Sequence, residues 1–278
     1  MKDINPLPDE TEGAAGAKPR GETSLILSSN LDGNSRRVKS EKVFGWMSMA
    51  WRNFMQNPPL WLGSTLLVLA AIVLLQIIPL LGQFASHLFL PVLFAGLLQI
   101  ARRIEAQSAR LGDLLAGFSQ GTSSLLAMGL IISIPLMLGA ALMFGWVALF
   151  FKGMAIGGLV PLVALYGQFP ALVMQAGFFA LILLAFILLF MLVLLPLVAM
   201  ALWFAPALAL FDGLSALSAM RASFVACLKN WLPLTLHGLI LFMLVSLGMM
   251  TAGLGLLLAI PLTVASLYYS YLDIFHSR

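Results

Sequence analysis

The chain has 278 residues, of which 61% are hydrophobic and 9% are charged, and its formal net charge is +4. Soluble domains are about 45–50% apolar and about 25% charged, and a soluble fold must cover its surface with polar groups. The composition therefore excludes both a soluble globular enzyme and a disordered protein. We expect an all-α, polytopic integral membrane protein.

The N-terminal residues 1–42 are polar, carry both signs of charge, and lack the apolar core of a secretory signal peptide. This composition predicts a disordered cytoplasmic tail. The remainder, 43–275, is expected to form a single transmembrane helical domain.

Four long stretches contain no Asp, Glu, Lys or Arg, and a spanning helix needs about 20 apolar residues. Turns at 81–83 and 253–255 divide two of these stretches. A Gly/Pro-rich apolar segment at 153–171 precedes the fourth span, and the sequence leaves open whether it spans, re-enters or lies on the outer face. The six predicted spans cover 60–81, 84–101, 123–150, 175–205, 232–250 and 255–272.

Charge asymmetry supports this number of spans. With six spans and the N-terminus inside, 14 of the 15 Lys and Arg residues lie on the cytoplasmic side, and only Lys152 falls outside. Basic residues beside the membrane mark the cytoplasmic face. Both termini are therefore expected in the cytoplasm. Topology also accounts for the net positive charge, so no nucleic-acid partner is expected.

Three amphipathic interfacial helices are predicted before the first, third and fifth spans, because their apolar faces and basic flanks suit the membrane interface. The first ends at Asn57, before two prolines. The second starts at Asp113, a residue type that caps helices, and the third starts near Ser215. The apolar face of the first consists of Val43, Trp46, Met47, Trp51 and Phe54.

The second span of each pair contains a proline, followed five residues later by a small residue and then by Leu. These prolines are Pro91, Pro196 and Pro261. Proline kinks a helix and a small residue admits a close neighbour, so the prolines are candidate hinges around a cavity. The alternative is that apolar sequences align by chance. The pattern predicts a threefold internal repeat with units 43–105, 110–211 and 215–275.

Several motifs in the last third of the chain form a distinctive set, namely Trp-Phe-Ala-Pro at 203–206, Asp212, Lys-Asn-Trp at 229–231 and the ending 265–275. Together they resemble an uncharacterised six-helix family of bacterial inner-membrane proteins. More distantly, 203–231 is similar to the membrane domain attached to some glycerophosphodiester phosphodiesterases, whose catalytic domain has no counterpart here. The resemblance implies the fold and a bacterial inner (cytoplasmic) membrane location, but no activity.

Groups that could perform chemistry are scarce. No charged residue lies at the centre of a predicted span, where such residues usually mark function. His87 and His237 are the titratable candidates within the spans, and we expect them to lie toward opposite sides of the membrane. Cys227 is the only cysteine, and the histidines lack metal-ligand spacing. We therefore expect no enzyme activity, no cofactor and no metal site.

Three charged residues at the cytoplasmic boundary are candidate contacts to a lipid headgroup or to a partner. Asp212 is either such a contact or a helix cap. Arg102 and Arg103 could bind anionic headgroups, although topology alone also explains them. The tyrosines of 268–271 are interpreted as an aromatic belt at the inner interface.

The leading hypothesis is a non-enzymatic scaffold or regulator of a membrane-associated partner, which would be a cytoplasmic or membrane protein. It rests on the charged cytoplasmic face, the interfacial helices and the lack of reactive groups. The alternative is a transporter or lipid-handling protein, with a cavity lined by the proline-kinked helices. The lipid bilayer is the remaining expected partner.

Overall fold

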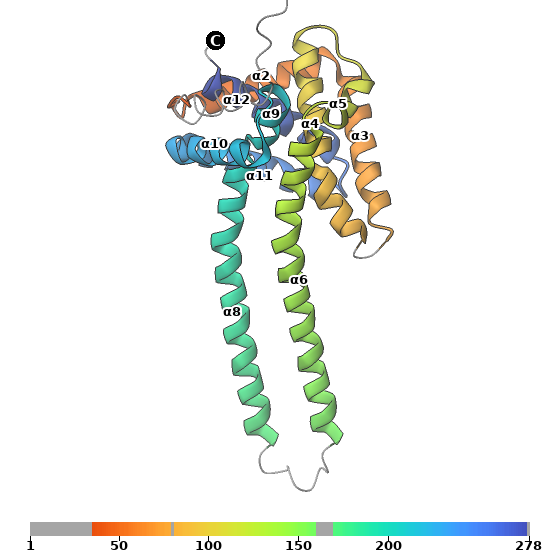
Figure 1. Ribbon diagram of the computed structural model, residues 1–278, viewed down its shortest axis with the longest axis vertical. Helices are drawn as coiled ribbons and strands as arrows, with labels where there is room; N and C mark the ends of the chain where they lie inside the picture. The colour runs from red at the N-terminus through yellow and green to blue at the C-terminus, as the bar shows by residue number, and fades with distance from the viewer. Residues whose placement is uncertain (1–34, 79–80, 160–168, 277–278) are drawn as a thin grey trace, which may run out of the picture.

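The computed structural model of the chain describes residues 35–78, 81–159 and 169–276 (Figure 1). These residues form helices and no strand, and six helical stretches are long and apolar enough to cross a membrane. The predicted all-α polytopic fold is therefore confirmed. The stretches are α3 (Pro58–Leu75), α4 (Leu81–Glu105), α6 (Thr122–Leu159), α8 (Phe169–Leu202) with α9 (Ala205–Phe211), α11 (Trp231–Met250) and α12 (Leu256–Phe275).

Shorter helices occupy the three positions where amphipathic helices were predicted. They are α2 (Lys42–Gln56), the 3-10 helix η1 (Leu111–Leu115) followed by α5 (Ala116–Ser119), and α10 (Ala216–Lys229). The second therefore consists of two short pieces. Asp113 does not start it, because its carboxylate accepts the backbone N–H of Arg110, 2.7 Å away, and Arg110 is the N-cap.

The first predicted turn lies earlier than expected. Helix α3 ends at Leu75 and α4 begins at Leu81, so Gly82 belongs to the first turn of α4. A Cβ atom at Gly82 would lie 1.6 Å from the Leu75 carbonyl oxygen. Gly82 is therefore required because α3 and α4 approach each other closely there, and not because the residue lies in the turn between them. The turn at 253–255 lies where it was predicted, between α11 and α12.

Helices α6 and α8 project side by side beyond the other helices (Figure 1). Helix α6 has 38 residues. At 1.5 Å per residue it is about 57 Å long, against about 30 Å for the hydrocarbon core of a bilayer. It takes in the first part of the 153–171 segment, and residues 160–168 lie outside the described residues. Too few residues remain between Leu159 and Phe169 for a seventh span.

Helix α2 packs against α12 through a buried stripe that differs from the predicted apolar face. Trp51 is 46% exposed, whereas Asn53 is fully buried. The Asn53 side chain donates to the carbonyl of Ala101 (2.9 Å) and to the hydroxyl of Tyr269 (3.1 Å), and accepts from the indole of Trp61 (3.1 Å). These hydrogen bonds explain why the polar Asn53 is buried in this helix while Trp51, which was predicted to be buried, is exposed. The stripe is Val43, Trp46, Ala50, Asn53 and Phe54.

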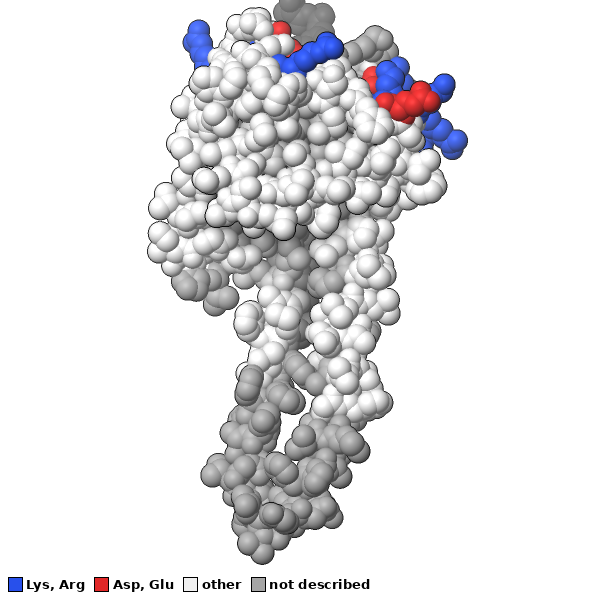
Figure 2. Space-filling view, turned by 180° about the vertical axis from the view of Figure 1, so that it is seen from behind, with Lys and Arg blue, Asp and Glu red and all other residues white. Residues whose placement is uncertain are grey.

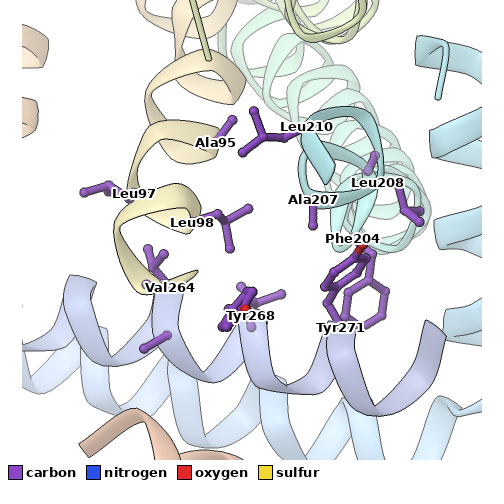
Figure 3. Close-up of a cluster of buried hydrophobic side chains, with 14 of the residues drawn as sticks. Ala95, Leu97, Leu98, Phe204, Ala207, Leu208, Leu210, Val264, Tyr268 and Tyr271 are labelled. Carbon is purple, nitrogen blue, oxygen red and sulfur yellow. The ribbon is translucent and has the colours of Figure 1, made fainter. Parts of the chain in front are cut away.

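The buried core joins α4, α9 and α12. Figure 3 shows Leu98 of α4, Ala207 of α9 and Tyr268 of α12 facing the same space. Leu98 and Ala207 are 1% and 3% exposed, respectively. Burial of this apolar surface fixes the three helix ends relative to one another.

Helix α4 lies so close to its neighbours that two contacts require glycine. A Cβ atom at Gly96 would lie 1.9 Å from the carbonyl oxygen of Leu114, and one at Gly129 of α6 would lie 2.3 Å from that of Leu88. Gly96 is the small residue that the sequence pattern places after Pro91. The small residue was predicted to let a neighbouring helix approach, and at Gly96 the neighbour is the 3-10 helix η1.

We predict that Gly96→Ala and Gly129→Ala each lower the stability of the folded protein by about 1–3 kcal/mol, because each methyl group would overlap backbone. Thermal unfolding in detergent measures this. Gly145→Ala is the matched control, since no atom lies within 4 Å of its Cβ position. An equal unfolding temperature for Gly96→Ala and the control would contradict the close packing.

Candidate functional site

Charged side chains gather at one end of the molecule. On the face shown in Figure 2, the blue and red atoms lie at the end opposite the projecting α6–α8 pair. We call this the charged end and define it by Arg36, Lys42, Arg102, Asp212 and Asp273. It is the region in which a polar ligand or a partner would find binding groups.

The segment 35–41, which the sequence places in the disordered tail, is held against the charged end. The backbone N–H of Arg36 donates to the carbonyl of Ile274 (3.0 Å), and that of Val38 donates to the side chain of Asn230 (2.8 Å). Asn230 in turn donates to the carbonyl of Arg36 (3.0 Å). Residues 1–34 of the predicted tail lie outside the described residues.

Asp273 is the centre of this attachment. It is 7% exposed, near the end of α12. Its carboxylate lies 3.2 Å from the guanidinium of Arg36 and 3.6 Å from the ammonium of Lys42, and accepts the indole N–H of Trp46 at 2.9 Å. Two cations and a hydrogen bond compensate a carboxylate that is largely withdrawn from water. We call these four residues the Asp273 cluster.

The tyrosines near Asp273 are part of the core, so the predicted aromatic belt is wrong. Tyr268, Tyr269 and Tyr271 are 4%, 4% and 1% exposed. Belt residues face the interface, whereas these rings pack against other rings of the core, such as Phe211, 5.9 Å from Tyr268.

A cavity of about 280 Å³ opens at the charged end, between the ends of α4, α9 and α12. It combines both signs of charge with four aromatic rings, one of which is the imidazole of His276. The sequence flagged two of its residues, Arg102 and Asp212. Tyr268 and Tyr271 were predicted to belong to an aromatic belt and not to a site. The remaining residues carried no signal, because the meeting of α4, α9 and α12 depends on the tertiary fold. The lining residues are Arg102, Phe211, Asp212, Tyr268, Tyr271, Leu272 and His276.

Asp212 is bound through its side chain within this cavity. Its carboxylate accepts the hydroxyl of Tyr271 at 2.6 Å and lies 3.4 Å from the imidazole of His276. The same imidazole nitrogen lies 2.7 Å from the Tyr271 hydroxyl. Asp212 is not the N-cap of α10, because Ser215 occupies that position. Asp212 is instead the C-cap residue of α9, and its carboxylate contacts the side chains of Tyr271 and His276.

The two neighbouring arginines have different surroundings. The guanidinium of Arg102 lies 5.0 Å from the ring centre of Phe211, within range of a cation–π interaction. Arg103 points elsewhere and lies 3.9 Å from the carboxylate of Asp113. The structure thus brings Arg102 together with Asp212 and leaves Arg103 outside the cavity.

The three prolines do not share one environment. Pro91 and Pro261 are buried inside α4 and α12, whereas Pro196 lies inside α8 and is exposed. None of them lines the cavity at the charged end. Their role as hinges or as the lining of a transport cavity stays a prediction.

The two histidines within the spans lie in separate environments. His237 is fully buried, bonds to Ser266 (3.0 Å) and packs against the ring of Trp46, 5.3 Å away. His87 lies 3.4 Å from Gln83 in α4. Within the described part of the chain, no group of three His, Cys, Asp or Glu residues is placed to hold a metal ion.

No protein-family model, curated protein or solved structure matches the chain. The resemblance to six-helix bacterial membrane proteins, and the more distant one to phosphodiesterase membrane domains, therefore stay predictions.

We predict that Asp273→Asn loosens the segment 35–41, because the neutral amide cannot pair with Arg36 and Lys42. Hydrogen exchange should show faster exchange at the backbone amides of Arg36 and Val38, by about tenfold or more. Asp113→Asn removes a carboxylate that does not touch this segment and serves as the control. Unchanged protection in Asp273→Asn would show that the Asp273 cluster does not hold the segment.

A second prediction concerns Cys227, which is 3% exposed and whose thiol points to the carbonyl of Met200 (3.5 Å). Burial raises the pKa of this thiol from 9.0 to about 12. The unfolded chain then loses the proton near pH 9 while the folded chain keeps it, so stability falls as pH rises through this interval.

Between about pH 9 and pH 12, the wild type should lose up to about 1.4 kcal/mol of unfolding free energy per pH unit more than Cys227→Ala does. Chemical unfolding at several alkaline pH values measures the difference. Equal slopes for the two proteins would mean that Cys227 is not protected from ionisation.

Proposed function

We propose that this protein is a non-enzymatic scaffold or regulator in a bacterial inner membrane, with both termini in the cytoplasm. Its charged end would hold a membrane-associated protein partner. The observation that carries the proposal is the fixed segment 35–41, which leaves Arg37 and Lys39 exposed at the charged end.

The proposed orientation is supported by the distribution of basic residues. Fourteen of the 15 Lys and Arg residues fall on the side of the charged end if six spans cross the membrane, and Lys152 is the exception. Basic residues next to spans favour the cytoplasmic side. A partner that docks on the charged end would therefore come from the cytoplasm or from the inner leaflet.

The arrangement of the cavity favours binding over catalysis. The hydroxyl of Tyr271 is buried between Asp212 and His276, at 2.6 Å and 2.7 Å. A nucleophile must be able to approach its substrate, and Tyr271 is only 1% exposed. The polar groups of the cavity are thus arranged to hold a ligand or to stabilise the helix ends.

We predict that the double variant Arg37→Glu/Lys39→Glu loses the partner. The protein, purified from native membranes in mild detergent, should carry one protein at near-stoichiometric amount, as quantified by mass spectrometry. Charge reversal at the exposed segment should lower its recovery by about tenfold or more, because like charges at an interface repel.

The matched control is Arg52→Glu/Arg110→Glu, which reverses two exposed charges outside the segment 35–41 and tests for general effects on topology. The proposal would be contradicted if the wild type carried no stoichiometric protein. It would also be contradicted if both double variants retained the protein equally.

A further inference from the structure

We propose that the cavity at the charged end binds a zwitterionic phosphoester, in which an ammonium group is joined to a phosphate. The headgroup of an ethanolamine phospholipid has this chemistry. The inference stands apart from the scaffold role, because it concerns a small ligand and not the segment 35–41.

The pairing of opposite charges in one cavity is the main argument. Arg102 and Asp212 both line it. A ligand that is only anionic would meet the carboxylate of Asp212, and a ligand that is only cationic would meet the guanidinium of Arg102. A zwitterion complements both charges at once, and complementary charges favour one ligand over others.

Arg102 supplies the phosphate-binding group. Its guanidinium lies over the ring of Phe211, 5.0 Å from the ring centre. A guanidinium that contacts an aromatic ring keeps planar N–H donors that match phosphate oxygens. Arg102 is exposed at the rim, in the last turn of α4, where a phosphate can reach it.

The other side of the cavity has the composition of an ammonium site. Asp212 lies beside aromatic side chains, since Tyr271 donates a 2.6 Å hydrogen bond to its carboxylate and the imidazole of His276 lies 3.4 Å away. The ring centre of Phe211 lies 5.7 Å from that of Tyr271 and 5.9 Å from that of Tyr268. A carboxylate beside aromatic rings is a favourable environment for an organic cation.

Size and position agree with a headgroup. The volume of about 280 Å³ lies near the lower limit of small-molecule sites, about 300 Å³, so the cavity has room for a headgroup. Arg102 and Leu272 lie in the last turns of α4 and α12, two helices that are apolar and long enough to span. The ends of spans lie at the level of lipid headgroups.

The test uses the full chain in nanodiscs that contain equal amounts of phosphatidylethanolamine and phosphatidylglycerol. Both lipids carry a phosphate, but only the first carries an ammonium group. After transfer to mild detergent, native mass spectrometry counts the lipids that remain bound. The wild type should retain phosphatidylethanolamine over phosphatidylglycerol by about tenfold, which is the effect of one charge-assisted contact.

The variants separate the two ends of the ligand. Asp212→Asn keeps an oxygen that can accept from Tyr271 but removes the charge, so the preference for phosphatidylethanolamine should disappear. Arg102→Gln should lower retention of both lipids. The controls are Arg103→Gln and Asp113→Asn, which change a neighbouring ion pair outside the cavity and should behave like the wild type.

Soluble phosphoethanolamine identifies the source of the ligand. If it displaces the bound lipid at millimolar concentration and raises the unfolding temperature, the site takes a soluble zwitterion as well. If only the diacyl lipid binds, the source is the membrane. Both results support a zwitterion site.

The proposal is overturned if the wild type retains the two lipids equally and soluble phosphoethanolamine does not bind. It is also overturned if folded Asp212→Asn keeps the wild-type preference. Should Asp212→Asn fail to fold, Arg102→Gln decides, because the Arg102 side chain is exposed and the substitution leaves no buried group unpaired. If Arg102→Gln then retained both lipids as well as the control Arg103→Gln does, the proposal would be overturned.

Discussion

A carboxylate that is shielded from water must be compensated by neighbouring groups, and Asp273 imposes this requirement on the whole charged end. Its partners come from the other end of the chain, namely Arg36, Lys42 and Trp46. Two of them belong to α2, so the same interactions fix α2 against α12. The position of the segment 35–41 is fixed as well, because its backbone then donates hydrogen bonds to Ile274 and Asn230.

Burial is distributed unevenly along the molecule, and the candidate functions follow that distribution. In the most apolar window of α12, 72% of the residues are buried, whereas the corresponding window of α8 has none. Exposed apolar side chains of α8, such as Leu188 and Leu192, are therefore available to lipid or to another protein. Precise positioning of polar groups needs a rigid surrounding, and the packed end, with α2, α4, α9 and α12, supplies it. The cavity lies at that end.

The sequence was sufficient for the features that depend on local composition. Long uncharged stretches predict spans, and the glycines of 253–255 predict the last turn. Arg102 and Asp212 could be flagged because charge is rare in this chain. Their meeting in one cavity could not be foreseen, since it depends on how α4 and α9 end beside each other.

Long-range polar contacts account for most of the errors. Apolar periodicity predicted that Trp51 would be buried, but Asn53 is buried instead. Asn53 is stabilised there by hydrogen bonds to distant residues such as Tyr269, which a local pattern cannot reveal. The tyrosines near the C-terminus have the composition of an interfacial belt, but α2 and α9 cover them. Segment 35–41 looks disordered by composition, and only its contacts with residues more than 190 positions away show otherwise.

The proposed partner can dock only if the charged end faces the cytoplasm, and sided labelling tests this orientation directly. The variant Arg37→Cys, made in a Cys227→Ala background, is treated with a membrane-impermeant maleimide, first in intact cells and then after permeabilisation. We expect Arg37→Cys to be labelled only after permeabilisation, whereas Lys152→Cys should be labelled already in intact cells. Labelling of Arg37→Cys in intact cells would place the charged end outside and contradict both the proposed partner and the orientation.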